Sequence, residues 1–246
     1  MIVFPSLSQL LAVIAILVCL TPAAAAAEPI RLTSGVRAPY FLPNQKGFLE
    51  QLIPEIFRRI GVTAEVVQYD ASARANINAN SGIDDGVAMR VKGLEKNFPN
   101  LLRVEEKIID NDFVAYSLTA DFATTSFETL RPYQVGYITG WKVFDDAIQP
   151  GTAVTHAPDA DHLFSLLAHG RVDVVLFERW QGHYIVQDRK LPAQLLQPPL
   201  VSTEMFMYLN KKHTPLLIPA AKALQAMKAD GSYQRIYVRT LGSIKE

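Results

Sequence analysis

Hydrophobic and polar positions follow two alternating periods from about residue 28 onward. The run IRLTSG at 30–35 predicts a strand, and FLEQLIPEIFRRIG at 48–61 carries apolar residues at helical spacing and ends on a glycine. TAEVVQY at 63–69 predicts a second strand, and ASARANINAN at 71–80 predicts a short helix. Such alternation of strands with helices is typical of an α/β fold with largely parallel strands.

One short pattern occurs twice along the chain. SGIDDGVAMR at 81–90 and HGRVDVVLFE at 169–178 share the order helix end, glycine, two residues, aspartate and apolar strand. Each glycine suits the position after a helix, where a left-handed backbone is needed. A charged residue follows the aspartate by five positions, namely Arg90 in the first copy and Glu178 in the second.

Both charged residues are expected beyond the carboxyl ends of parallel strands. Open α/β sheets bind ligands at this edge, so Arg90 would offer a cation and Glu178 an anion to a ligand. Alternatively, each residue is a solvated end of a strand or pairs with a neighbouring charge, as Glu178 could with Arg179. The spacing alone leaves both interpretations open.

The composition is that of a soluble globular protein. Of 246 residues, 49% are hydrophobic, and 24 basic side chains balance 24 acidic ones, which gives no indication of a nucleic-acid-binding surface. There is no G-x-S-x-G, Walker or dinucleotide-binding motif, and no H-x-x-x-H or H-E-x-x-H spacing. We therefore expect no cofactor, no metal site and no catalytic residues. The histidines considered for a metal site are His156, His162, His169, His183 and His213.

The amino-terminal segment 1–27 differs from the rest of the chain. It has no charged side chain and contains the apolar run LLAVIAILVCL, and Ala25 and Ala27 have the A-x-A spacing of a cleavage site. These features predict a secretory signal that is removed after Ala27 or one residue earlier, or alternatively an uncleaved anchoring helix. The single cysteine, Cys19, lies in this segment, so we expect no disulfide in the exported protein.

Several stretches together resemble a known family. They are IRLTSG with the turn RAPY at 37–40, the predicted helix at 48–61, the two glycine–aspartate strands, and the closing stretch KALQAMKADGSYQRIYVRTLG at 222–242, which is the most specific. In these features the chain is similar to the type 2 periplasmic solute-binding proteins, specifically the polar amino-acid-like family 3 that serves ABC importers.

The resemblance implies a two-lobed α/β fold. Two mixed sheets flanked by helices would be joined by two hinge strands near DFVAYSLTAD at 112–121 and VSTEMFMYLN at 201–210. Lobe I would comprise residues 28–117 and 205–246, and lobe II would comprise residues 118–204. The solute would bind between the lobes.

The resemblance also implies candidate ligand-binding residues. Tyr40 would stack on the solute, although a tyrosine at the edge of the core is the alternative. Glu178 would hold a ligand ammonium. The backbone amides near Gly140, Trp141 and Lys142 would face the cleft, where free amides at a helix start favour a carboxylate or phosphate. The alternative is an ordinary strand–helix connection with a lysine on the surface.

The chain departs from the family pattern after the first glycine–aspartate strand. It lacks the usual threonine, and Arg90 stands earlier than the family's carboxylate-binding arginine. We expect Arg90 or Arg74 to bind a carboxylate of the ligand, since a guanidinium can form a bidentate pair with it. Arg74 resembles a recurrent arginine in a subgroup of such proteins. It lies near a helix start, where a cation opposes the helix dipole, so a functional or paired role and plain solvent exposure both stay open.

These features predict a monomeric periplasmic protein that captures a small polar solute, zwitterionic or anionic, and delivers it to the permease of an ABC importer. One alternative is a lyase or dehydratase in which Glu178 transfers the proton. Another is a soluble ligand-binding partner of a membrane sensor.

Overall fold

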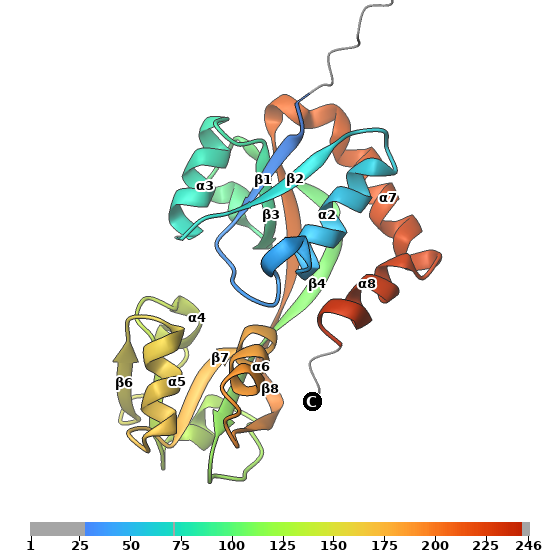
Figure 1. Cartoon of the computed structure of the whole chain (residues 1–246). Coiled ribbons are helices and arrows are strands. Elements are labelled where there is room, and N and C mark those ends of the chain that lie inside the picture. Colours follow the sequence, from blue (N-terminus) through green and yellow to red (C-terminus); the bar gives the residue numbers. More distant parts are fainter. Residues whose placement is uncertain (1–27, 71, 243–246) are drawn as a thin grey trace, which may run out of the picture.

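The computed structural model describes residues 28–70 and 72–242, which form two lobes joined by two long strands (Figure 1). The predicted signal segment lies outside the described residues. Within those two ranges, no helix combines the length and the apolar character needed to cross a membrane.

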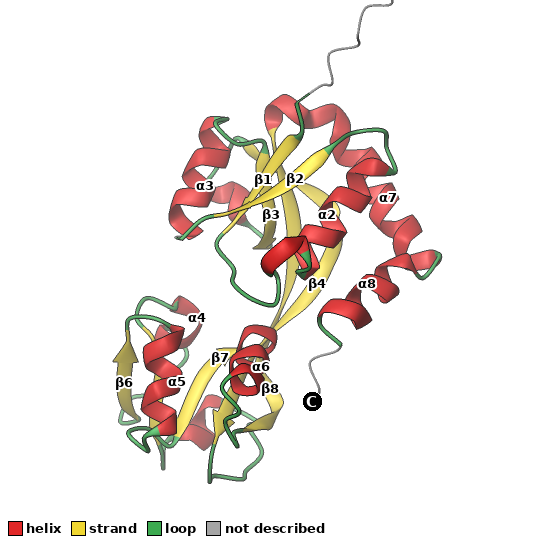
Figure 2. Ribbon diagram, viewed as in Figure 1, coloured by secondary structure: helices red, strands yellow, loops and turns green. Residues whose placement is uncertain are grey.

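Lobe I contains three parallel strands with helices on both faces (Figure 2). The predicted strands and helices of its amino-terminal part are confirmed, with bounds that are shortened or shifted by a few residues. Its elements are β1 (Ile30–Ser34), η1 (Pro43–Gln45), α2 (Phe48–Arg58), β2 (Ala64–Gln68), α3 (Ser72–Ser81), β3 (Gly86–Val91), η2 (Leu94–Lys96), η4 (Lys211–Leu216), α7 (Leu217–Ala229) and α8 (Ser232–Thr240).

Lobe II repeats this architecture on a smaller scale, with β5 parallel to both β6 and β7. Its elements are η3 (Phe127–Leu130), β5 (Gln134–Ile138), α4 (Lys142–Asp145), β6 (Ala153–Ala157), α5 (Ala160–Ala168), β7 (Val174–Glu178) and α6 (Arg179–Asp188).

Two strands, β4 (Leu101–Ser117) and β8 (Gln194–Asn210), run through both lobes. They pair with each other in both lobes, so the strands form one sheet in the order β2-β1-β3-β8-β4-β7-β5-β6. The predicted α/β class with two lobes is confirmed. The expectation of two separate sheets is corrected to one continuous sheet, because the hinge strands are long enough to belong to both halves.

The strand directions make the carboxyl ends of the parallel strands in one lobe face those in the other lobe. Strand β8 runs from lobe II into lobe I, β3 is antiparallel to it, and β1 and β2 run with β3, so these three end toward lobe II. Strand β4 runs the opposite way, β7 is antiparallel to it, and β5 and β6 run with β7, so they end toward lobe I. Figure 1 shows this arrangement. Ligands of open α/β sheets bind at such ends.

The apolar stripe of the predicted helix at 48–61 explains how α2 packs. It turns six side chains into the core of lobe I, and the chain leaves the helix before Gly61, which has φ of +73°. Burying side chains of this size contributes roughly 1.5–3 kcal/mol each. The six are Phe48, Leu49, Leu52, Ile53, Ile56 and Phe57.

The internal repeat is structural in both copies. Gly82 and Gly170 have φ values of +84° and +63°, as the helix ends require. Each aspartate then fixes the start of the neighbouring parallel strand. Asp85 Oδ2 accepts a hydrogen bond of 2.8 Å from the backbone N–H of Arg31. The equivalent aspartate, three residues after Gly170, accepts one of 2.8 Å from the backbone N–H of the first residue of β5. The repeat therefore places Arg90 and Glu178 at equivalent strand ends.

Candidate functional site

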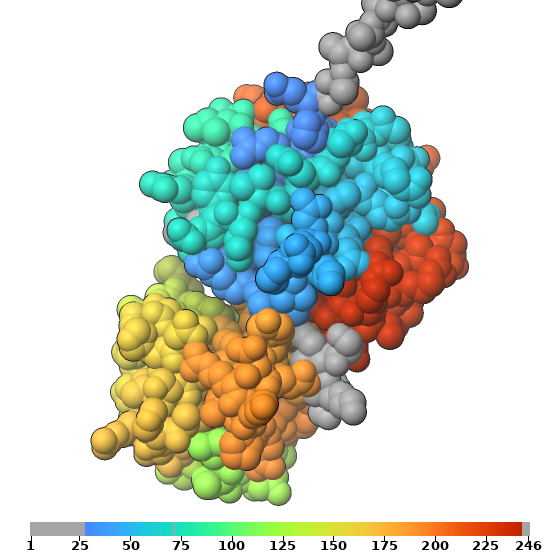
Figure 3. All heavy atoms as spheres, viewed as in Figure 1, coloured from blue at the N-terminus to red at the C-terminus, as the bar shows by residue number. Residues whose placement is uncertain are grey.

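The region between the facing strand ends is the candidate site. On the lobe I side, the start of α3 lies directly against the end of β1, since a Cβ added to Gly35 would stand 2.4 Å from Ser72 Oγ. On the lobe II side lie the ends of β5 and β7. Figure 3 shows the blue surface of lobe I meeting the yellow and orange surface of lobe II.

Arg90 lies at the end of β3 and turns toward α3. Its Nε donates to Asn76 Oδ1 at 3.1 Å and its Nη1 donates to the Met89 carbonyl at 3.0 Å. Its Nη2 is buried and has no hydrogen-bond partner among the residues that the structure describes. Burial lowers the pKa of this guanidinium to about 10. A half-buried cation whose described partners are all neutral is costly, which makes Arg90 a candidate for binding an anion.

Two further arginines lie close to the start of α3. Arg74 is exposed in the first turn of this helix, and the structure shows no hydrogen bond or ion pair for it within the described ranges. Arg37, in the turn after β1, pairs with Asp70 at 3.3 Å between Nη2 and Oδ1. The Asp70 side chain is 99% exposed. This side of the site is therefore cationic.

Glu178 is buried, with 2% of its surface exposed, and its oxygens are engaged within the protein. It caps α6 by accepting hydrogen bonds from the backbone N–H of Trp180 at 3.0 Å and of Gln181 at 2.9 Å. Burial is the main cause that raises its pKa. No contact in the described part of the chain joins Glu178 to Arg90. The neighbouring Arg179 pairs with Asp112 at 3.3 Å.

Tyr40 is fully buried and bridges the two lobes. Its hydroxyl donates to Glu178 Oε1 at 3.0 Å, and burial, with Glu178 second, raises its pKa well above the ordinary value. Its ring packs edge-on against Phe48 with the centroids 6.3 Å apart. Tyr40 therefore holds the alternative position considered from the sequence, at the edge of the core, and supports Glu178 from the opposite lobe.

The stretch from Gly140 to Lys142 lies at the end of β5. Gly140 and Lys142 are exposed, and Lys142 begins α4, which is only four residues long. The backbone N–H of Trp141 donates to the Ile138 carbonyl at 3.2 Å, so this amide is engaged in a turn. The indole ring stacks on Phe177 with a centroid distance of 4.9 Å. This segment contributes a cation and an aromatic surface to lobe II.

The first turn of α6 also joins the lobes, which the sequence did not predict. Trp180 is 7% exposed and belongs to the hydrophobic core of lobe I, although its helix belongs to lobe II. Its ring packs edge-on against Tyr237 of α8 at 5.6 Å. Gln181 Oε1 accepts a hydrogen bond of 3.0 Å from the backbone N–H of Arg37. We call Glu178, Trp180 and Gln181 the inter-lobe contact.

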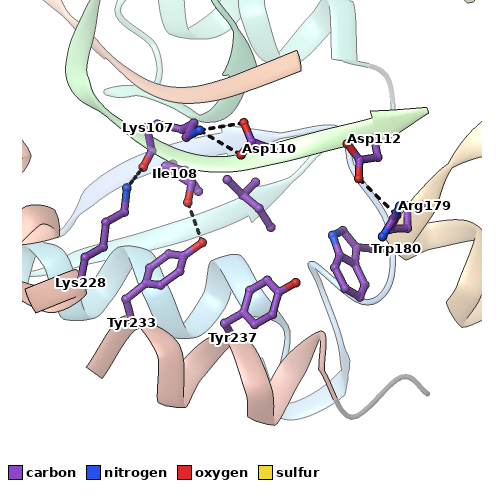
Figure 4. A pocket seen from close by; sticks show the side chains of 10 residues that line it. Lys107, Ile108, Asp110, Asp112, Arg179, Trp180, Lys228, Tyr233 and Tyr237 are labelled. Carbon is purple, nitrogen blue, oxygen red and sulfur yellow. Dashed lines mark hydrogen bonds and ion pairs between the residues drawn. The ribbon is translucent and has the colours of Figure 1, made fainter. Parts of the chain in front are cut away.

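A cavity of about 360 Å³ lies beside this contact, between β4, α8 and the start of α6 (Figure 4). Its charged groups are paired: Lys107 with Asp110 at 2.8 Å, and Lys228 with Glu106 at 2.5 Å. Tyr233, which with Tyr237 forms one face of α8, donates to the Ile108 carbonyl at 2.7 Å. None of the ligand-binding residues predicted from the sequence lines this cavity.

Three of the five histidines line a separate groove of about 430 Å³ between β6 and α5 on lobe II. His162 contacts Asp159 at 2.9 Å, and His156 packs on the ring of Tyr137. In residues 28–70 and 72–242, no three histidine, cysteine, aspartate or glutamate side chains are grouped so that they could hold a metal ion.

Comparison with known proteins gives one relative in sequence and many in structure. No protein-family model matches the chain. An uncharacterized protein of Shewanella oneidensis is 25% identical over an alignment of 184 residues, and the match covers 70% of this chain and 68% of that protein.

Three solved structures represent the structural similarity. An ancestral arginine-binding protein bound to glutamine has a TM-score of 0.69 at 21% identity, and the match covers 87% of this chain and 98% of that protein. The GluR0 ligand-binding core from Nostoc punctiforme in complex with L-glutamate has a TM-score of 0.69 at 17% identity, covering 86% and 99%. The substrate binding protein of an amino acid ABC transporter has a TM-score of 0.66 at 16% identity, covering 87% and 99%.

At these identities the similarity establishes the fold. The chain has the two-lobed periplasmic-binding-protein fold, and its structural neighbours include amino-acid-binding proteins of the type that the sequence resembles. The predicted resemblance is confirmed at the level of the fold.

Proposed function

We propose that this protein is a periplasmic solute-binding protein that captures a small polar solute between its two lobes and delivers it to the permease of an ABC importer. The shared fold supports this proposal, because the similar structures include a substrate binding protein of an amino acid ABC transporter. The proposed lobes are residues 28–117 with 205–246 and residues 118–204, and the last part of β4, residues 113–117, crosses into lobe II, where it pairs with β7. A solute that contacts both lobes would favour the closed form.

The proposal rests on the environment of Arg90, that is, on its burial and its hydrogen-bond partners. Among residues 28–70 and 72–242, its half-buried guanidinium has no acidic partner and its buried Nη2 has no hydrogen-bond partner, and it lies at the end of a strand that points toward the other lobe. A carboxylate or phosphate of a bound solute would supply the missing acceptor in a charge-assisted pair. Arg74 and Lys142 are exposed and would reinforce the attraction from the two lobes.

The lyase alternative receives no such support. It requires Glu178 to transfer a proton to or from a substrate, yet this carboxylate is buried and holds Tyr40 and two backbone N–H groups. The sensor alternative keeps the same binding event and differs only in the membrane partner.

A binding titration with a matched pair of variants tests the proposal. A thermal-shift screen of organic acids and amino acids identifies a solute, and isothermal titration then compares Arg90→Gln with Arg58→Gln, an exposed arginine on α2. We expect Arg90→Gln to weaken binding tens-fold to thousands-fold, as for other charge pairs that lose one member, at about 2–5 kcal/mol. Arg58→Gln should bind as the wild type does. Equal affinities in both variants would contradict the role of Arg90.

Export gives a separate test of the location. We expect mass spectrometry of the protein recovered from the periplasm to show a mature chain that starts at Ala27 or Glu28, because the A-x-A pattern directs cleavage there. Recovery of the full-length chain from the membrane fraction alone would contradict a released periplasmic protein.

A further inference from the structure

The charges at the candidate site bear on the chemical class of the solute, provided that the proposed function holds. A solute with an α-amino group needs hydrogen-bond acceptors in the protein for its ammonium group, because this group carries three N–H donors and no acceptor. It also needs donors in the protein for its carboxylate.

The anion-binding side of the site is well supplied. Arg90 is held by Asn76, which is two residues from Arg74 in the same turn of α3. Arg37 pairs with Asp70, just before this helix. Three guanidinium groups therefore lie on or next to the first turns of α3 with one carboxylate among them. Lys142 adds a fourth cation from the opposite lobe.

The ammonium-binding side is already used by the protein itself. Glu178 Oε1 accepts from the Tyr40 hydroxyl and from the Trp180 N–H, both at 3.0 Å, and Oε2 accepts from the Gln181 N–H at 2.9 Å. Only 2% of the residue is exposed, and Tyr40 covers it from lobe I. An ammonium could reach this carboxylate only by displacing a buried hydroxyl, which would then lose its partner.

Asp70 is a poor substitute acceptor. Its side chain is almost completely exposed and already contacts Arg37, so an ammonium placed there would remain in water and gain little. The excess of cations and the buried, hydrogen-bonded carboxylate of Glu178 both favour an anionic solute that has no ammonium group.

We propose that the solute is an anion with two acidic groups and no ammonium group, such as a dicarboxylate or a phosphorylated carboxylic acid. One acidic group binds the unpaired Nη2 of Arg90, and the second is held by Arg74 or by Lys142 across the cleft. The protein thus uses the fold of amino-acid-binding proteins for a ligand of different charge.

Matched pairs of solutes test this inference by isothermal titration of the purified protein. Succinate is compared with aspartate and glutarate with glutamate, because each pair differs by one ammonium group, while 3-phosphoglycerate tests the phosphorylated class and butyrate the single carboxylate. We expect a dicarboxylate or 3-phosphoglycerate to bind at least ten-fold more tightly than every amino acid and than butyrate. Whichever diacid binds more tightly identifies the class.

The outcomes separate the inference from the proposed function. If aspartate or glutamate binds more tightly than its partner without the ammonium group, or butyrate binds as tightly as the diacids, the inference is overturned while solute binding stands. If none of the six binds and a wider screen of small solutes also fails, both are overturned.

A variant provides the second measurement. If Arg74 holds the second acidic group, Arg74→Gln should weaken the best diacid at least ten-fold and leave butyrate within about two-fold, because a single carboxylate uses Arg90 alone. Lys142→Gln is examined in the same way as the other candidate for the second group. If neither variant changes the preference for a diacid over butyrate, binding of a second acidic group at these residues is overturned.

Discussion

Replacing Trp180 with alanine is expected to lower the free energy of unfolding by roughly 3–5 kcal/mol, the usual range for a large buried aromatic side chain. Trp180 is 7% exposed, packs in the lobe I core and contacts Tyr237 edge-on. Its removal would empty the place where α6 enters the opposite lobe. Denaturant unfolding followed by circular dichroism measures the loss, and Tm should fall by about 6–20 °C for a chain of this size.

The chain offers a matched control because it contains two tryptophans. Trp141 is half-buried and packs within lobe II against Phe113, Phe144 and Phe177. We expect Trp141→Ala to cost less than Trp180→Ala and to leave the contact between the lobes intact. Trp180→Phe should recover much of the stability, since a ring would again fill the position.

The arrangement of the lobes provides the readout that separates a joining role from simple core packing. Small-angle scattering of the folded Trp180→Ala protein should show a larger radius of gyration than the wild type, while Trp141→Ala should not. If Trp180→Ala is no less stable than Trp141→Ala, the assignment of Trp180 to the lobe I core is wrong.

Local periodicity predicted those parts of the fold that depend on neighbouring residues. The apolar stripe at 48–61 is sufficient to place α2 on a sheet, and the repeated glycine and aspartate define helix ends and strand starts in both lobes. The same repeat placed Arg90 and Glu178 at strand ends. The helix and the glycine turns follow from local backbone geometry, whereas each aspartate binds the start of a strand that lies 54 or 39 positions away along the chain.

Contacts between distant segments could not be predicted in this way. The sequence placed an acid at the end of β7 but could not show that Tyr40, 138 positions earlier, donates to it. It gave no sign that the tryptophan after Glu178 faces lobe I, because one apolar residue after a strand fits either lobe. The continuity of the sheet likewise depends on the full 17-residue lengths of β4 and β8.

Replacing Glu178 with alanine is the second large effect that we expect, with a loss of roughly 2–4 kcal/mol. Loss of the helix cap costs about 1 kcal/mol, and the buried Tyr40 hydroxyl left without its acceptor costs about 1–3 kcal/mol. Thermal unfolding measures the sum. Tyr40→Phe is the control, because it removes the hydroxyl and leaves the cap, and it should cost less than Glu178→Ala.

Glu178→Gln tests the buried charge itself. Burial raises the pKa of Glu178, so the folded protein binds a proton more readily than the unfolded chain. The stabilisation from this proton is complete below the ordinary glutamate pKa and is lost as the pH rises through the raised value. A glutamine has no such proton to lose, yet its amide can cap α6 and contact Tyr40. The stability of Glu178→Gln relative to wild type should therefore increase across this pH range, as measured by denaturant unfolding at a series of pH values. A difference that falls as the pH rises would show that the hydrogen bonds from Tyr40, Trp180 and Gln181 outweigh burial and lower the pKa of Glu178, and a constant difference would show that folding does not shift this pKa.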